Sequence, residues 1–544
     1  MNWSDLTHKA VSVFARNAMV PVYRIKLRRF EKLLQEGAAV QQRALFSKIR
    51  RCENSRFGRD HKFAGIRTVA DFRKSVPISQ YEYLSPYIDD VAAGDIEALF
   101  PASEKVLMFA CTTGTTGRPK LNPVTKTWLK EYKRDWEVWG VKAIADHAHM
   151  IGTKILQLIG PPDLGKTKSG LDIGMVSSVA ARYQDPLLQT FYAVPNNVCT
   201  IADSLSKYYT LLRLAIVNRV GMICTITPAN LIRLAQISDQ YRDQLIKDVH
   251  DGTLWKDLEV STTLRQQWAS RIGRPQPGRA KELERVIERT GTLYPKDFWP
   301  IALLNCWIGG TVGYQSKNLA QYYGDIPTRD VGLLSTEGRH TIPVEDGKPE
   351  GVLAIEANYY EFIPAADRGS ATPTILEAHE LTPGQDYYIL MTTSSGLYRY
   401  DIGDLVRCNG FRGQAPLIEF LQKVSNCADM EGEKISEHQV VQAVARASQR
   451  LGLELDFFTA VPVRPERGSP YYALLVEEHH LPEDSKAQAL LNLVDEDLVA
   501  QNVMYAGKRG DNYIGAWQLL RLPRGNWRQF TESVMRGRGT GDSQ

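Results

Sequence analysis

A short apolar segment that leads directly into a threonine- and glycine-rich loop is the feature that most constrains this chain. The segment is Val106–Ala110, and the loop, Cys111–Lys120, carries four threonines, two glycines and a lysine. Glycine lets backbone N–H groups turn toward one point, and the hydroxyls and the lysine add further donors, so the loop can surround a polyphosphate. With a helix expected to begin near Thr125, the pattern predicts the strand–loop–helix arrangement that presents N–H groups to phosphate.

The loop alone leaves two interpretations open. Its spacing is not GxxxxGK[ST], so it is not a Walker A loop. We interpret it as the phosphate loop of an enzyme that activates a carboxylate with ATP. A flexible turn of the same composition is the alternative.

The chain as a whole has the composition of a soluble globular protein. Its 544 residues are too many for one domain, and 43% are hydrophobic and 24% charged. The net charge of +4 gives no argument for a nucleic-acid partner, and no segment is apolar enough over a sufficient length to be an integral membrane segment. The seven scattered cysteines include no CxxC pair, which favours a reducing, cytoplasmic location.

Apolar segments and helical patterns alternate between residues 150 and 360, which predicts an α/β fold. Expected strands are 221–226, 303–307 and 351–355, and expected helices are 203–219 and 228–248. The first hundred residues look helical, with loops at Pro77 and Pro86. The charged segment 256–290 reads as a solvated helical insertion.

The pattern changes after Phe420, where a helix at 436–451, a strand at 471–476 and a helix at 486–500 are expected. We therefore predict a large multi-layer α/β N-terminal domain, residues 1–423, and a smaller mobile α+β C-terminal domain, residues 424–544.

Two further polar segments could meet the loop at one nucleotide. In Leu333–Gly338, a glutamate beside two hydroxyls could hold Mg²⁺ through oxygen ligands, although a helix N-cap is the alternative. In Tyr398–Asp404, Asp404 could accept hydrogen bonds from ribose hydroxyls, or could lie in an ordinary β-turn. Arg399 could orient a carboxylate or phosphate, or could pair with an acidic neighbour.

In these segments the chain resembles the auxin-responsive Gretchen Hagen family of acyl acid–amido synthetases, part of the adenylate-forming superfamily. The most specific segment is Gly396–Asp404, followed by Val406–Arg407, Gly410–Phe411, Ala415–Pro416 and Phe420. The other similar segments are Pro77–Asp89, Thr113–Lys120, Ser335–Glu337 and Tyr359–Pro364.

The resemblance implies a role for each matching residue. The phosphates of ATP would be held by Thr112, Thr113, Gly114, Thr115, Thr116 and Gly117, with Lys120 as a catalytic cation. Glu337 would bind Mg²⁺ and serve catalysis, and Ser335 and Thr336 would lie near the adenylate. Asp404 would bind ribose, Tyr398 would line the nucleotide pocket, and Arg399 is a further candidate. Lys423 lies where the family has a basic hinge residue.

The sequence departs from the family pattern at two places. Leu334 stands where the family usually has glycine before the Ser-Thr-Glu group. The segment Arg536–Gln544 resembles the lead-in to a C-terminal lysine of the family, and the sequence given ends at Gln544.

These features predict a two-step ligase that uses ATP and Mg²⁺. It would adenylate a carboxylic acid and pass the acyl group to an amine, with an amino acid as the expected acceptor. The acid would bind in the N-terminal domain, where the segments 176–183, 208–212 and 307–314 are possible walls or simply core. The alternatives are an acyl-CoA synthetase-type ligase and a degenerate nucleotide-binding scaffold. The acid, the amine and the oligomeric state do not follow from the sequence.

Overall fold

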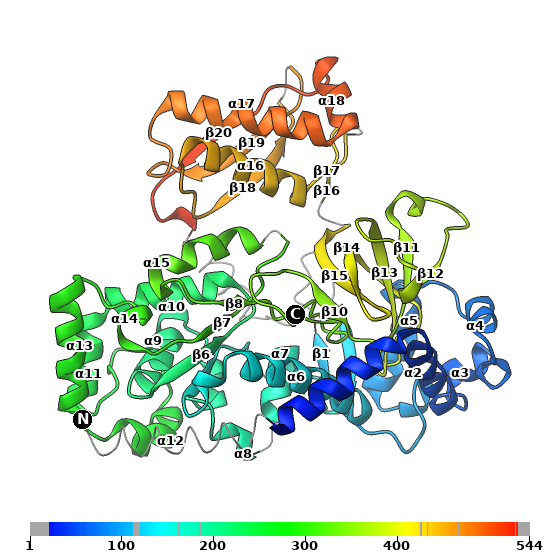
Figure 1. The fold of residues 1–544 in the computed structure, drawn as a ribbon, viewed down its shortest axis with the longest axis horizontal. Helices are drawn as coiled ribbons and strands as arrows, with labels where there is room; N and C mark the ends of the chain where they lie inside the picture. The colour runs from blue at the N-terminus through cyan, green and yellow to red at the C-terminus, as the bar shows by residue number, and fades with distance from the viewer. Residues whose placement is uncertain are drawn as a thin grey trace. The chain divides into compact units, whose positions relative to one another are not determined.

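The computed structural model describes residues 21–111, 120–160, 164–183, 186–310, 312–424, 427–431, 433–465, 468–527 and 529–530. Its contacts divide the chain into two units. Unit 1 comprises Met1–Gly309 and Leu319–Phe420, and unit 2 comprises Gly310–Asn318 and Leu421–Gln544. Figure 1 shows the ribbon of both units.

A parallel sheet of order β3-β6-β7-β8 lies within unit 1. Its strands are β3 (Lys154–Gln157), β6 (Val220–Cys224), β7 (Leu303–Asn305) and β8 (Thr328–Arg329). All five residues of β6 are buried, as expected of a strand covered on both faces. Helices α9 (Ser204–Ala215) and α10 (Pro228–Gln240) pack beside it in Figure 1, which confirms the predicted α/β layers.

The helices around this sheet differ from the prediction in one respect. The helix expected over 228–248 is two helices, α10 and α11 (Arg242–Asp251), because Tyr241 leaves helical geometry at φ −113° and ψ 24°. The charged insertion forms α12 (Thr262–Ile272) and α13 (Pro277–Thr290), and α13 lies beside α11 in Figure 1. The shorter helices are α7 (Val176–Arg182), α8 (Pro186–Gln189), α14 (Pro295–Phe298) and α15 (Leu319–Tyr323).

A second sheet, of order β2-β1-β5-β4, flanks the threonine–glycine loop. Its strands are β1 (Val106–Cys111), β2 (Leu121–Thr125), β4 (Gly165–Lys166) and β5 (Asp172–Gly174). β1 and β2 are antiparallel, with Cys111 opposite Leu121. The expected strand–loop–helix order was therefore wrong, because β2 intervenes before α6 (Lys126–Asp146), although Thr125 does cap that helix.

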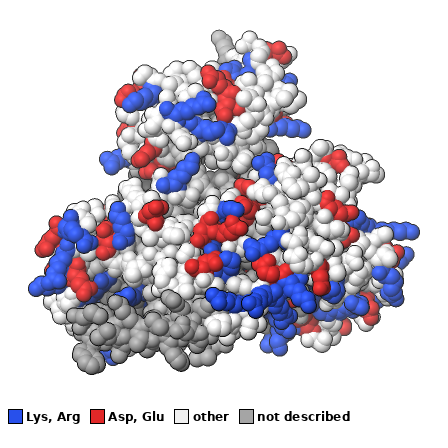
Figure 2. All heavy atoms as spheres, in the orientation of Figure 1, with Lys and Arg blue, Asp and Glu red and all other residues white. Residues whose placement is uncertain are grey.

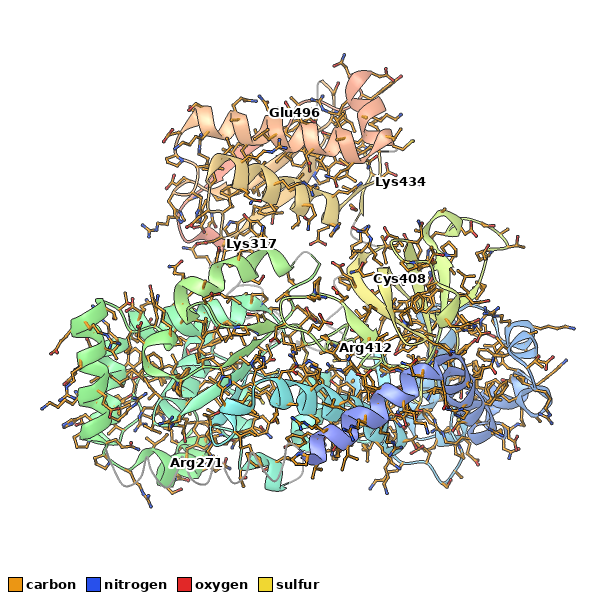
Figure 3. The ribbon with its side chains drawn as sticks, in the orientation of Figure 1. Arg271, Lys317, Cys408, Arg412, Lys434 and Glu496 are labelled. Atoms are coloured by element: carbon orange, nitrogen blue, oxygen red, sulfur yellow. The ribbon has the colours of Figure 1, made fainter. Side chains whose placement is uncertain are left out.

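The third sheet has seven strands in the order β12-β11-β13-β14-β15-β10-β9. They are β9 (Thr341–Ile342), β10 (Gly351–Leu353), β11 (Tyr359–Pro364), β12 (Leu376–Glu377), β13 (Asp386–Thr392), β14 (Tyr400–Arg412) and β15 (Ala415–Lys423). Figure 3 labels Cys408 and Arg412 on the half of β14 that lies farther from Tyr400.

Helices precede the three sheets in the chain. Residues 21–35 are helical, followed by α2 (Gly37–Arg51), α3 (Arg56–Asp60), α4 (Val69–Ser75) and α5 (Tyr81–Ala93). The loop expected at Pro86 was wrong, because Pro86 lies inside α5. Proline has no N–H to donate to the Glu82 carbonyl one turn earlier, and the hydroxyl of Ser85 donates to that carbonyl instead. Figure 2 shows Lys and Arg gathered along the first helix, where 21–35 contains five of them.

Unit 2 is a small α+β fold. The antiparallel pair β18 (Phe458–Val463) and β19 (Tyr471–Glu477) is extended by β20 (Gln518–Leu522), which runs parallel to β19. Its other elements are α16 (Glu437–Leu451), α17 (Asp484–Gln501), α18 (Val503–Gly510), β16 (Cys427–Ala428) and β17 (Ile435–Ser436). The helices and the strand expected from the sequence are confirmed. None of the helices in the described part of the chain is long and apolar enough to cross a membrane.

Candidate functional site

The end of the threonine–glycine loop is fastened by Tyr81, the first residue of α5. Its hydroxyl accepts the N–H of Leu121 at 2.7 Å and donates to the Leu121 carbonyl at 3.2 Å. The Nζ atom of Lys120 lies 5.4 Å from the centroid of the Tyr81 ring, a cation–π distance. The predicted phosphate ligands Thr112, Thr113, Gly114, Thr115, Thr116 and Gly117 lie outside the described residues.

The Ser335–Gly338 segment is a tight turn. Backbone hydrogen bonds join Ser335 and Gly338 in both directions, and Leu334 pairs with Arg339 across the turn. No helix begins in this segment, so the N-cap interpretation was wrong. The hydroxyl of Ser335 accepts the N–H of Glu337 and contacts the Nε2 atom of His340 at 2.8 Å.

Two side chains from outside the turn hold its apex. The indole N–H of Trp128 on α6 donates to the Glu337 carbonyl at 2.8 Å. The amide of Asn122 on β2 donates to the Thr336 carbonyl at 2.7 Å and to the Ser395 hydroxyl at 3.2 Å. The Thr336 hydroxyl donates to the Glu337 carboxylate at 2.9 Å, and the Glu337 side chain is buried. The turn is therefore built against the strand and helix that follow the loop.

The third predicted segment lies at a bulge of β14. Leu390 and Tyr388 of β13 pair with Asp401 and Leu405, so residues 402–404 lie opposite a single residue. Gly403 has a φ of +75°, which glycine adopts without strain, and Asp404 beside it is buried.

The Pro77–Asp89 segment is attached directly to this bulge. The N–H of Ser79 donates to the Arg399 carbonyl, and the N–H of Asp401 donates to the Ser79 carbonyl. Two residues beyond Ser79, Tyr81 reaches the end of the loop. The backbone of Ser79 and the side chain of Tyr81 thus connect the strand that carries Asp404 with the end of the loop.

Hydrogen bonds bring the three segments together, because Asn122 links the end of the loop to the turn of Glu337, and Ser79 and Tyr81 link it to the strand of Asp404. Burial, together with the charge of Glu337 and other carboxylates, raises the pKa of Tyr81 to about 12. Burial also raises the pKa of Tyr400, and Glu337, Tyr81 and Asp404 are among the neighbours that add to this shift. Glu337 therefore acts on both phenols and Asp404 on one of them. We call Tyr81, Leu121, Glu337, Tyr400 and Asp404 the Tyr81–Tyr400 cluster.

Tyr398 and Arg399 have structural contacts instead. The Tyr398 ring is buried in the core and stacks on Phe57 at a centroid distance of 4.9 Å, so no nucleotide surface is left on it. Arg399 donates through Nε to Glu361 at 2.8 Å and through Nη1 to the Val76 carbonyl at 2.9 Å. Of the two interpretations of Arg399, pairing with an acidic neighbour is the one observed.

The remaining predicted residues lie in several places. Lys423 is exposed at the end of β15 and belongs to unit 2. Residues 208–212 are core of unit 1, and Trp307 donates to the Gly332 carbonyl at 2.7 Å. Tyr314 belongs to unit 2, where it packs against Phe458.

Sequence reasoning missed Tyr81, a member of the cluster, and also Asn122 and Trp128, which hold the turn of Glu337. Tyr81 lay in a segment noted only for its resemblance, and Trp128 lies on the helix expected to begin near Thr125, where it was given no role in the site. Asn122 lies in β2, a strand that the sequence did not predict, so no pattern marked it, although only 3% of its surface is exposed.

The fold is shared with solved ligase structures. A GH3.15 acyl acid amido synthetase superposes with a TM-score of 0.83 at 20% identity, covering 94% of this chain and 91% of that one. A 2-hydroxyisobutyryl-CoA ligase in its postadenylation state superposes with a TM-score of 0.51 at 12% identity, covering 93% and 92%. The class is thus an α/β protein with the fold of adenylate-forming ligases.

Family comparisons place the chain within that class. The GH3 family N-terminal domain matches residues 26–328, the central domain 351–423 and the C-terminal domain 438–544. The chain belongs to the GH3 family, which confirms the resemblance found in the sequence. Jasmonoyl–L-amino acid synthetase JAR4 of Nicotiana attenuata is 23% identical, covering 95% of this chain and 91% of that protein. Indole-3-acetic acid-amido synthetase GH3.4 of Arabidopsis thaliana is also 23% identical, covering 94% and 89%.

Proposed function

We propose that this chain is an ATP-dependent acyl acid–amido synthetase. A carboxylate attacks the α-phosphate of ATP, which gives an acyl-adenylate and pyrophosphate. An amine, with an amino acid as the expected substrate, then attacks the acyl carbonyl, forms the amide and releases AMP. The convergence of the loop end, Glu337 and Asp404 in the Tyr81–Tyr400 cluster is the observation that carries this proposal.

The first step requires control of charge, because two anions must approach one another. In our proposal the residues Thr112–Gly117 surround the phosphates and Lys120 neutralises part of their charge. Tyr81 holds Leu121 and with it the end of the loop. Asp404 binds the ribose hydroxyls from the bulge of β14.

The residues present fit a magnesium ion at Glu337. Its buried carboxylate accepts the Thr336 hydroxyl, and no Lys, Arg or His of the described chain forms an ion pair with it. A carboxylate with a neighbouring hydroxyl is the donor set that Mg²⁺ uses when phosphates supply its other ligands. Glu337 would hold the ion, and the ion would supply a positive charge at the phosphate oxygens.

In the second step, pyrophosphate must leave the site and the amine must enter it. A hinged C-terminal domain, residues 424–544, with Lys423 at the hinge, would serve this exchange. We place the enzyme in the cytoplasm, which agrees with the finding that the six cysteines whose side chains are described are free and buried.

The second candidate is a thioester-forming ligase that uses coenzyme A after the same adenylation. The fold shared with a CoA ligase keeps this candidate open. The decisive experiment measures carboxylate-dependent ATP–pyrophosphate exchange across a panel of acids, then AMP release with mixed amino acids or with coenzyme A. Amino-acid-dependent AMP release and an amide detected by mass spectrometry would support our proposal. ATP binding without exchange for any acid would favour a non-catalytic scaffold.

A further inference from the structure

Arg339, two residues beyond Glu337, is a buried cation without hydrogen-bond partners. Only 1% of its surface is exposed, and Nε, Nη1 and Nη2 all lack a partner among the described residues. A guanidinium carries five N–H donors, and burying them unpaired is costly. Such a group in a folded protein calls for an explanation.

Other deeply buried arginines of this fold do have hydrogen-bond partners. Arg213 donates to the carbonyls of Thr253 and Ile272. Arg329 forms ion pairs with Asp146 and Asp346. Arg339 instead lies over the Trp136 ring at 4.2 Å and the Trp139 ring at 5.6 Å. These cation–π contacts stabilise the positive charge but make no hydrogen bonds with its N–H groups.

The guanidinium lies where open α/β sheets bind ligands. Cys224, which ends β6, and Asp330, which follows β8, are among the groups whose charges act most on Arg339. Both positions are at the carboxyl ends of parallel strands, the edge at which ligands of such sheets are held. Trp136 and Trp139 of α6 close the other side.

The acidic residues nearby do not neutralise Arg339. Burial raises the pKa of Asp135 to about 8, so this carboxyl is mostly uncharged at neutral pH. Asp330 accepts the N–H groups of Ile308 at 2.7 Å and Gly332 at 2.6 Å, and neither aspartate forms an ion pair with Arg339 in the described chain. Asp330 is mostly ionised at neutral pH, because burial raises its pKa only to about 6, and its charge offsets part of that of Arg339, but the N–H donors of the guanidinium remain for an incoming anion.

We propose that Arg339 binds a second carboxylate of the acyl acid, so that the preferred substrates are dicarboxylic acids. This inference rests on the proposed function. The carboxylate that reacts belongs at the Tyr81–Tyr400 cluster, whereas the guanidinium of Arg339 lies over the rings of Trp136 and Trp139. A carboxylate can accept two parallel N–H bonds from one guanidinium. The cavity beside Arg339 measures about 10 Å³, room for one water molecule, and is lined by Trp128, Glu131, Tyr132 and Asp135, so side chains around it must move when the acid binds.

The test compares acids that carry either an alkyl group or a second carboxylate of similar size, such as 3-isopropylbenzoate with isophthalate and heptanoate with adipate. Exchange is measured for the wild type, R339K and R339M. We expect the wild type to favour the diacid at least tenfold in kcat/KM, R339M to lose that preference, and R339K to be intermediate because lysine lacks the planar fork. A wild type that activates acids but prefers the monoacid in every pair overturns the inference, whereas no exchange with any acid refutes the proposed function instead.

Thermal unfolding separates this role from a structural one. R339M removes an unpaired buried charge, so its Tm should be unchanged or higher without acid. The matched control R213M loses two carbonyl partners, so its Tm should fall while its acid preference stays unchanged. Isophthalate alone should raise the Tm of the wild type and not that of R339M. A preference for diacids that survives in R339M would show that Arg339 only stacks on the indoles.

Discussion

The hydroxyl of Tyr81 is the contact whose loss tests the architecture of the site most directly. Tyr81→Phe keeps the ring, its packing and the cation–π contact with Lys120, and removes only the two hydrogen bonds to Leu121. Each bond contributes about 1 kcal/mol net, so about 2 kcal/mol of the free energy that fixes the loop end is lost. If all of it appears in nucleotide binding, ATP affinity falls about 30-fold.

Part of that free energy will appear as lower stability, so we expect the KM for ATP to rise between about threefold and 30-fold. The assay is carboxylate-dependent ATP–pyrophosphate exchange, with ATP affinity measured by calorimetry on the same preparations. The pH profile between about 6 and 9 should stay unchanged, because burial keeps the pKa of Tyr81 near 12 and the phenol protonated throughout.

Tyr83→Phe, on the same helix, is the matched control. It removes a hydrogen bond to the Nε2 atom of His61 at 2.6 Å and leaves both hydrogen bonds between Tyr81 and Leu121 in place. Its ATP affinity should stay within about twofold of the wild type, well under the loss from one hydrogen bond. If Tyr81→Phe bound ATP and supported exchange like the wild type, while unfolding at a lower temperature, Tyr81 would be a structural residue and the cluster would lose its link to the loop.

Four further substitutions test the remaining assignments. Glu337→Gln should weaken adenylation and raise the Mg²⁺ concentration needed for half-maximal exchange, since a neutral amide holds the ion poorly; an unaltered Mg²⁺ titration would remove it from the metal role. Asp404→Ala should lower ATP affinity about tenfold through lost ribose contacts, as calorimetry would show. Arg399→Met should lower the free energy of unfolding in urea by about 1.5–3 kcal/mol and leave ATP affinity unchanged, because Glu361 loses one charged partner and keeps its ion pair with Arg73. Asp135→Asn should raise the Tm at pH 8 and change it little at pH 4. Because burial raises the pKa of Asp135 to about 8, the wild-type protein loses stability as the pH rises from about 4 toward 8, and asparagine, which does not titrate, removes that loss.

The sequence predicted elements well where periodicity was strong and partners were local. The buried strand β6 and the capped helix α16 lie within a residue or two of the ranges expected. β2 was missed because Pro123 lies inside it, and proline argues against a strand. The structure resolves the conflict, since β2 is the edge strand of its sheet and its outer N–H groups need no partner.

Side-chain roles within the site were harder to predict than the elements that carry them. Asp404 and Glu337 were identified from their polar neighbours and from the resemblance, and both lie at the Tyr81–Tyr400 cluster. Tyr398 belongs to the same short segment as Asp404, yet it points into the core. Tyr398 lies before β14 begins and Asp404 lies beyond its bulge, so the regular alternation of side chains along a strand does not relate the two positions, and the sequence shows neither the start nor the bulge.

Arg339 and Arg399 show why such roles depend on residues distant in the chain. Both are buried; Arg339 lies two residues from Glu337, and Arg399 lies five residues from Asp404. Nothing in the sequence around either arginine shows whether its role is structural or ligand-binding. Glu361, on β11, reaches Arg399 and makes it an ion pair of the fold. The elements around Arg339 bring two indoles and a largely uncharged aspartic acid instead. Whether a buried arginine is structural or binds a ligand therefore depends on the acceptors that the rest of the chain supplies. A guanidinium whose N–H groups are already bonded within the protein has no donors left for a substrate.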